Sequence, residues 1–459
     1  MALPTILFNS GTGSDTAASG AGPGTALSGA NASLGASTTV ALAVDAPDLS
    51  GVATDGSAVC WVDSTSGRQY SRITAVDNVA KSVTVATAYG VTEATRAWGI
   101  GGKRATLDHA DSRTLGADVE AGWIVEIEDD GASALTGSAW PITAGVAFTI
   151  RGDSISTKRL MTQSANAAAL TLSVTATTLD VANLIFENTA GTKTSANGIV
   201  VTANNPTIRI RNCRFGHSAN TLLSGLNRTA GAPVFILYDC EVMSCTSNGV
   251  SSRAGLHVHG SYIHDNAAHG LATGGGGGVN IIQDSVVEAN GTDGINVGTT
   301  PTTLVISGNA IHGNTGDGLD SSGGAGFIPI SGQIYNNNFT ANGNYGIRAA
   351  SGENPAFLDF NNFGTGALAN TSGSMLNLTA GANDLAVDPG YTNASGGNFA
   401  AGTAIKAKGF PASTQAFGAN PAAGTIAFVD IGIQREEPAS GGDPFPSQGI
   451  QHIGTGVCA

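Results

Sequence analysis

The chain has 459 residues, and its 65 glycines together with only 12% charged residues are typical of a protein built from β-strands and turns. Its 20 basic and 34 acidic residues give a formal net charge of −14, which argues against nucleic-acid binding and binding to anionic membranes. No apolar run approaches the ~20 residues of a membrane-spanning helix, so we expect no membrane insertion. The N-terminus lacks the basic and apolar segments of a signal peptide.

Two different segments precede the regular part of the chain. Residues 1–37 are rich in glycine, serine, alanine and threonine, so we expect an arm that is either flexible or ordered against a partner. Residues 38–115 contain short apolar runs separated by turn residues. This pattern predicts a small antiparallel β-domain that serves as an anchor.

Between residues 116 and 370 an apolar residue recurs at a nearly regular spacing, which predicts a solenoid. The recurring residues are Phe186, Phe215, Val242, Ile263, Val287, Ile311, Phe339 and Phe363. The residues five positions earlier are all aliphatic: Val181, Ile210, Leu237, Val258, Ile282, Ile306, Ile334 and Leu358. We expect each of these two sets to form one inward column.

The internal spacing of the repeat predicts three short strands separated by bends. The positions five and two residues before each recurring apolar residue have opposite strand phases, so a bend must lie between them. Five repeats share a later glycine, which we expect to adopt backbone angles that other residues resist. These glycines are Gly249, Gly270, Gly294, Gly318 and Gly346. The predicted fold is therefore an all-β, three-sided parallel β-helix behind a small antiparallel β-domain.

The regularity fades after the solenoid. Residues 371–436 contain short apolar runs, and we expect them to form closing coils or a C-terminal cap. Residues 437–459 contain proline and glycine but few core residues, which predicts a tail.

Asparagine recurs at two fixed positions of the repeat. The two sets are Asn266, Asn290, Asn314 and Asn342, and Asn309, Asn337 and Asn361. A stacked asparagine can donate to one neighbour and accept from the other, so we predict two structural ladders rather than ligand-binding sites.

Two sets of residues are candidates for chemistry, each with a structural alternative. Asp293 and Asp317 on adjacent coils have a spacing that suits paired catalytic carboxylates, although aspartate before glycine also favours a turn. No lysine or arginine lies between Arg253 and Arg348, so a catalytic base is difficult to place near them.

The second set is a row of candidate metal ligands on three adjacent coils: His264, Glu288 and His312. We expect these residues to face outward, and the alternative is a solvated row without a metal. We predict no cofactor.

Several apolar residues occupy positions that should point away from the solenoid interior. They are Ile236, Ile281, Val305, Phe357, Tyr262 and Val286. Because an outer apolar surface is usually covered, we predict a subunit interface in a homo-oligomer. The alternatives are scattered surface residues and cover by the chain's own tail.

The five cysteines are expected to be mainly buried free thiols. Cys213 and Cys240 fall in one inward column on adjacent coils, where a disulfide is sterically conceivable. The lack of a signal peptide favours free thiols instead. The role of Cys458 in the tail stays open.

The repeats resemble the right-handed, pectate-lyase-like β-helix family, and further motifs are similar to β-helix proteins of tailed-phage virions. The front-module motifs are LFNSGTGSDTAASGAGPGTALSG, SGVATDGSAVCWVDSTSGRQYSRITAVDN and AWGIGGKRATLDHADSR, and DPGYTNASGGNF with VDIGIQ resembles a closing segment. In lyases of this fold, clustered aspartates bind calcium and an arginine or lysine acts as the base.

The resemblance implies a structural virion-surface protein, either capsid decoration, a head fibre or a tailspike, and more readily a non-enzyme than an enzyme. It would form a homotrimer, contact other virion proteins through its N-terminal arm, and be made in the host cytoplasm. The alternative implied by the same fold is a receptor-binding tailspike that degrades host surface polysaccharide as a lyase or glycosidase.

Overall fold

The computed structural model describes the chain from Thr5 to Phe399 with gaps. The described residues are 5–8, 27–35, 37–43, 46, 48–50, 52, 54, 59–64, 67–86, 88–89, 91–101, 103–104, 124–128, 130, 134–137, 140–142, 147–173, 178–202, 206–252, 255–274, 278–298, 303–323, 332–353, 355–391, 393–394 and 399. The chain divides into two compact units, Met1–Gly191 and Thr192–Ala459. The predicted tail, residues 437–459, lies outside the described residues.

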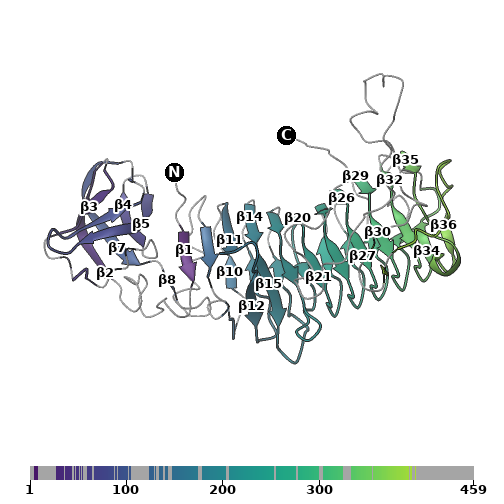
Figure 1. Ribbon diagram of the computed structural model, residues 1–459, viewed down its shortest axis with the longest axis horizontal. Helices are drawn as coiled ribbons and strands as arrows, with labels where there is room; N and C mark the ends of the chain where they lie inside the picture. Colours follow the sequence, from purple (N-terminus) through teal and green to yellow (C-terminus); the bar gives the residue numbers. More distant parts are fainter. Residues whose placement is uncertain are drawn as a thin grey trace, which may run out of the picture. The chain divides into compact units, whose positions relative to one another are not determined.

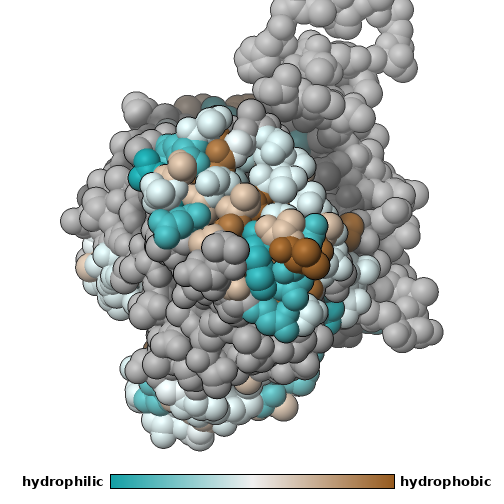
Figure 2. All heavy atoms as spheres, turned by 90° about the vertical axis from the view of Figure 1, so that its left-hand side faces the viewer, coloured by the Kyte–Doolittle hydropathy of each residue, from teal (hydrophilic) through white to brown (hydrophobic). Residues whose placement is uncertain are grey.

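The first unit contains a closed antiparallel barrel. Its strands follow the order β2-β3-β6-β5-β4-β7. They are β2 (Leu27–Leu34), β3 (Thr39–Ala41), β4 (Val59–Ser64), β5 (Gly67–Asp77), β6 (Ser82–Val85) and β7 (Glu93–Gly101). Alternate residues of these strands form the core, including Val62, Ile73 and Trp98. On the described part of the face in Figure 2, hydrophilic and hydrophobic residues are mixed.

The small antiparallel β-domain predicted from the sequence is confirmed, but it begins earlier than expected. Strand β2 lies within residues 1–37, which we expected to be an arm, and it pairs with β7 along the barrel. The cause is that β2 places Ala32 and Leu34 in the barrel core despite its many small residues. Strand β1 (Thr5–Phe8) lies in the same range and pairs in parallel with β9 (Ile124–Ile127).

The first unit also contains parallel strands of the solenoid. Strand β11 (Phe148–Gly152) pairs with β9 and with β14 (Thr178–Ala182). Strand β12 (Arg159–Gln163) pairs with β15 (Leu184–Asn188), and β10 (Trp140–Ile142) pairs with β13 (Leu170–Leu172). Three strands per repeat therefore form here, although this part of the sequence is less regular.

The second unit is a stack of coils whose strands form three parallel sheets (Figure 1). Sheet 1 contains β17 (Thr207–Arg211), β20 (Val234–Tyr238), β23 (Gly255–His259), β26 (Val279–Gln283), β29 (Thr303–Ser307), β32 (Gln333–Tyr335) and β35 (Phe357–Asp359). Sheet 2 contains β18 (Arg214–Phe215), β21 (Glu241–Met243), β24 (Tyr262–His264), β27 (Val286–Glu288), β30 (Ala310–His312) and β33 (Asn338–Thr340). Sheet 3 contains β16 (Ile199–Val201), β19 (Leu226–Arg228), β22 (Val250–Ser252), β25 (Leu271–Thr273), β28 (Ile295–Val297), β31 (Leu319–Ser321), β34 (Tyr345–Ala349) and β36 (Gly373–Leu376).

The predicted inward column of sheet 1 is present and in register. Ile282 pairs with Ile306, Ile306 with Ile334, and Ile334 with Leu358. The three isoleucines are fully buried. The predicted three-sided parallel β-helix is therefore confirmed, and β36 extends it beyond residue 370. A 3-10 helix, Gly366–Leu368, is the helical element of the described residues, and none of their helices is long and apolar enough to cross a membrane.

The predicted bend between sheets 1 and 2 is a single residue in the left-handed conformation. Asn212, Asp239, Asp284 and Asn336 occupy this corner with φ between 50° and 57°. Asparagine and aspartate tolerate this conformation better than most residues, which explains their recurrence. Phe360 holds the same corner in the last coil with φ 59°.

The recurring glycines serve a different purpose from the one we predicted. Gly294 and Gly318 do not have positive φ. A Cβ atom at Gly294 would lie 2.8 Å from Asn314 Nδ2 and 2.9 Å from the carbonyl oxygen of Gly318 on the next coil. These positions therefore exclude a side chain because adjacent coils approach too closely.

Both asparagine ladders run through the coils. Each amide Nδ2 donates to the Oδ1 of the next asparagine at 2.8–3.0 Å, as between Asn290 and Asn314. The same Oδ1 atoms accept backbone N–H groups. The longer ladder continues to Asn370, and the shorter one ends at Asp384, whose carboxylate accepts from the amide and backbone of Asn361. The ladders satisfy buried polar groups inside the solenoid.

We predict that Asn314→Ala lowers the free energy of unfolding by about 3 kcal/mol, because the backbone N–H and Nδ2 of Asn290 lose their buried acceptor. Chemical denaturation followed by circular dichroism measures the change. The control Gln333→Ala replaces an exposed side chain and should change stability by less than about 0.5 kcal/mol. Equal effects of the two substitutions would contradict the ladder's role.

Candidate functional site

The acidic corner, formed by Asp293, Asp317 and Asp320, lies where the chain enters the inner strands β28 and β31 of sheet 3. Asp293 and Asp317 stand directly before the close-packed glycines that lead into β28 and β31. Asp320 is the middle residue of β31 and pairs in register with Arg348 on β34. One carboxylate oxygen from each of the three aspartates lies within 4.8 Å of the others. The coil repeat thus brings together three residues that are separated in the sequence.

The two buried aspartates of the corner form bonds from one coil to the next. Oδ1 of Asp293 accepts the backbone N–H of Asp317 at 2.8 Å. Oδ1 of Asp317 accepts the backbone N–H of Tyr345 at 2.8 Å. The structural role that we considered as an alternative is therefore real, since each carboxylate satisfies a backbone group.

The remaining carboxylate oxygens of the corner face polar side chains. Asp293 Oδ2 lies 3.1 Å from His269 Nδ1. Asn296 Nδ2 donates to Asp293 at 3.3 Å and to Asp320 at 3.4 Å. Carboxylate oxygens are ligands that Ca²⁺ prefers, so Asp293, Asp317 and Asp320 form a group that could hold such a cation.

The surroundings move the pKa values of the two buried aspartates in opposite directions. Burial raises the pKa of Asp317, and the carboxylates of Asp293 and Asp320 raise it further. Burial also opposes ionisation of Asp293, but hydrogen bonds from His269 and from the Asp317 backbone outweigh it and lower the pKa of Asp293. Two carboxyl groups with separated pKa values can act as an acid and a base.

We expected a base to be difficult to place near Asp293 and Asp317, but the structure puts a basic side chain beside them. Arg348 NH1 lies 3.6 Å from Oδ2 of Asp317, because β34 stacks on β31 and brings Arg348 beside the corner. Arg348 was not predicted as a neighbour of this corner, whereas His269 occupies the position of Asp293 and Asp317 on an earlier coil. The available signal for Arg348 was its position in the repeat, since it follows Asp320 by one coil at the same place.

The candidate metal ligands His264, Glu288 and His312 are each engaged in contacts of their own. His264 and Glu288 are only 7% exposed, rather than facing solvent as we expected. The two ring nitrogens of His264 contact Glu241 at 3.1 Å and Asp265 at 2.8 Å. His312 Nδ1 contacts Thr340, and Glu288 accepts the hydroxyl of Tyr262.

These contacts leave the row without converging ligand atoms. Among the described residues, the acidic corner is the group of three or more histidine, cysteine or acidic side chains whose ligand atoms lie close enough together to share one metal ion. The physical reason is that each member of the row already has a partner on its own coil or on an adjacent one.

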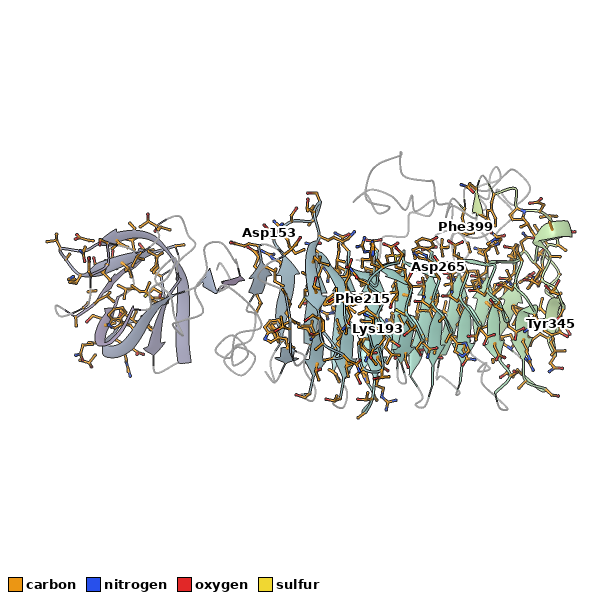
Figure 3. The ribbon with its side chains drawn as sticks, turned by 90° about the horizontal axis from the view of Figure 1, so that it is seen from below. Asp153, Lys193, Phe215, Asp265, Tyr345 and Phe399 are labelled. Carbon is orange, nitrogen blue, oxygen red and sulfur yellow. The ribbon has the colours of Figure 1, made fainter. Side chains whose placement is uncertain are left out.

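Two residues of the predicted subunit interface are covered by the chain itself. Tyr262 and Val286 form a buried cluster with Ala310 and Phe399, and Tyr391 packs against it. Figure 3 shows Phe399 on the same side of the solenoid as Asp265, which follows β24. Residues of the predicted closing coils, Tyr391 and Phe399, therefore cover these two residues. The alternative that we considered, cover by the tail, concerns residues 437–459, which lie outside the described residues.

The other predicted interface residues lie on the outer face of sheet 1. Ile236, Ile281, Val305 and Phe357 are partly exposed. Tyr238 and Val279 on the same sheet are 38% and 37% exposed. A partner for this face stays a prediction.

The four described cysteines are buried free thiols. Burial raises the pKa of Cys60 and of Cys245 to about 12, so neither thiol ionises near neutral pH. The free-thiol prediction for Cys213 and Cys240 is confirmed. Cys458 lies outside the described residues.

Comparison with known proteins supports the fold and leaves the function open. Residues 197–363, less than half of the chain, match the family described as "Right handed beta helix region". The match coincides with the coils of the second unit and agrees with the handedness that we predicted. No curated protein matches the chain.

We predict that Asp317→Asn raises the free energy of unfolding at pH 7. A carboxyl whose pKa is raised in the folded state loses stability as pH rises from 3.8 through that raised pKa, and the amide removes this loss while it can still accept from Tyr345. The gain should disappear as the pH falls below 3.8. Thermal unfolding from pH 3 to pH 8 measures it.

The matched control for this prediction is Asp320→Asn, which removes the same charge from a more exposed position. Its gain at pH 7 should be smaller. A loss of stability in Asp317→Asn at neutral pH would show that the ion pair with Arg348 outweighs the cost of burial.

Proposed function

We propose that this chain is a structural protein of a tailed-phage virion surface, in which the solenoid projects and the N-terminal part attaches it to the capsid or tail. The observation that supports this best is the continuous coil-to-coil register of sheet 1 from β17 to β35, reinforced by the asparagine ladders. The ladders pair buried amide groups of one coil with those of the next, which stiffens the solenoid along its length. The resemblance of the front motifs to phage β-helix proteins supports the location.

We also propose that the protein forms a homo-oligomer. The partly exposed residues Ile236, Ile281, Val305 and Phe357 occupy one register position on the outer face of sheet 1, in a row that also contains His257 and Gln333. A strip of this kind suits contact with another copy along the length of the solenoid. By resemblance to phage spikes, we propose a homotrimer, together with contacts to other virion proteins through the N-terminal residues.

A second candidate function is degradation of host surface polysaccharide. The specific observation in its favour is the pair Asp293 and Asp317, whose pKa values move apart, with Arg348 3.6 Å from Asp317. A carboxyl with a raised pKa can donate a proton to a leaving group, and an ionised partner can accept one. In this candidate Arg348 would face an acidic sugar.

The proposal is tested by labelling particles released from the source culture with antibodies against the second unit. We expect label on the virion surface, and its position distinguishes capsid decoration, head fibre and tailspike. Light scattering of the purified protein should give three times the mass of one chain. A monomer at micromolar concentration, or label on cell envelopes but not on particles, would contradict the proposal.

The same purified protein separates the two candidate functions when it is incubated with host surface polysaccharide. The structural proposal expects neither new reducing ends nor absorbance at 235 nm. Either signal, if abolished in Asp317→Asn, would support the degrading enzyme instead.

A further inference from the structure

After the last coil, Leu385 extends sheet 2 by one further bridge, and the chain then returns along the solenoid. Asn338 pairs with Asn362 and Asn362 with Leu385 as isolated parallel bridges. The side chain of Asn362 accepts from the backbone of Val387 at 3.0 Å, and its amide donates to the carbonyl oxygen of Val387 at 3.0 Å. The next residues, Asp388–Tyr391, Asn393, Ala394 and Phe399, are here called the strap.

The strap lies along the outer side of sheet 2 and runs toward earlier coils. Tyr391 and Phe399 contact each other edge to face, with ring centroids 5.0 Å apart. Phe399 is fully buried with Ala310, Val286 and Tyr262, which lie on three successive coils. The strap therefore covers an apolar column that would otherwise face water.

His312 lies at the centre of the contact between the strap and the solenoid. Its ring centroid is 5.5 Å from that of Phe399 and 5.8 Å from that of Tyr391, and both aromatic rings meet it edge-on. Its Nδ1 contacts the hydroxyl of Thr340 at 2.9 Å. Burial under the strap lowers the pKa of His312 to about 4, so the imidazole is neutral at pH 7.

The ionisable groups nearest His312 are Glu288 on the preceding coil and Asp388 and Tyr391 on the strap. Glu288 occupies the same position on the preceding coil and accepts the hydroxyl of Tyr262. On the strap, Asp388 is exposed, and burial raises the pKa of Tyr391, which keeps this phenol neutral. A proton added to His312 would therefore place a charge beside two aromatic rings, where burial disfavours the charged form.

The other histidine of the row behaves in the opposite way. Burial disfavours the charged form of His264, but its contacts with Asp265 and Glu241 outweigh burial and raise its pKa. The charged form of His264 is thus stabilised in the folded chain, and acidification does not weaken its surroundings. His312, whose neutral form is favoured by burial, is therefore the group through which we expect acid to act on the strap.

We propose that the strap is an acid-released cover of sheet 2, docked when His312 is neutral and detached when His312 is protonated. This inference does not depend on the proposed virion function. Detachment would expose the apolar column of Tyr262, Val286 and Ala310.

The pH dependence of strap docking follows from the difference in proton binding between the docked and the detached state. A free imidazole has a pKa of 6.5 and the docked His312 a pKa of about 4, so between these values the detached state binds a proton that the docked state does not. Each pH unit below 6.5 therefore shifts the equilibrium toward detachment by about tenfold, and the whole interval by about 300-fold. Above pH 6.5 the equilibrium should not change.

Hydrogen exchange measured by mass spectrometry tests the proposal, with EDTA present and with intrinsic rates corrected for pH. Peptides containing the strap should lose protection between pH 6.5 and pH 4, while peptides of β29 and β32 keep theirs. In His312→Gln the strap should show no pH dependence over this interval. The matched control His257→Gln, on the outer side of sheet 1, should behave like the unsubstituted protein.

A second measurement covers the case in which His312→Gln leaves the strap undocked at every pH. Nuclear magnetic resonance of ring-labelled histidine should show His312 of the unsubstituted protein titrating well below 6.5. Titration of His312 at 6.5 while the strap stays protected would overturn the proposal. So would a strap whose protection is constant from pH 7 to pH 4, or a pH dependence that persists in His312→Gln.

Discussion

The parallel hydrogen bonding between successive coils is the constraint on which the rest of the structure depends. Because neighbouring strands lie ~4.8 Å apart, each side chain touches the residue at the same place in the next coil. Ile282, Ile306 and Ile334 therefore stack into one buried column. The same constraint admits asparagine inside the solenoid, since an amide can donate to one coil and accept from the other.

Features that repeat in every coil could be predicted from the sequence, and features that occur once could not. The inward column and the asparagine ladders each leave a residue at a fixed place in many repeats. The recurring glycines also hold a fixed place in the repeat, but the reason for them lies in the adjacent coil. A Cβ atom at Gly294 would lie only 2.9 Å from the carbonyl oxygen of Gly318. Sequence spacing within one repeat does not contain that information.

Contacts made by a single residue were beyond the sequence argument. Arg348 approaches Asp317 because β34 stacks on β31. Its register with Asp320 was a signal in the sequence, but it is a single basic residue and not one that recurs in each repeat. Phe399 lies beyond the regular repeats, yet it buries Tyr262 and Val286. His264, Glu288 and His312 do occupy one register position on successive coils, as the spacing indicated. Their burial and their hydrogen-bond partners arise from tertiary contacts that the spacing does not contain.

The most direct test of the coil register is disulfide formation between paired cysteines introduced on the outer side of sheet 1. Ile281 is the register partner of Val305, and Val305 is the partner of Gln333. The account predicts that Ile281→Cys with Val305→Cys oxidises within one chain, whereas Ile281→Cys with Gln333→Cys, about 9.6 Å apart across two coils, does not. Peptide mapping that finds the second disulfide but not the first would contradict the stacked architecture.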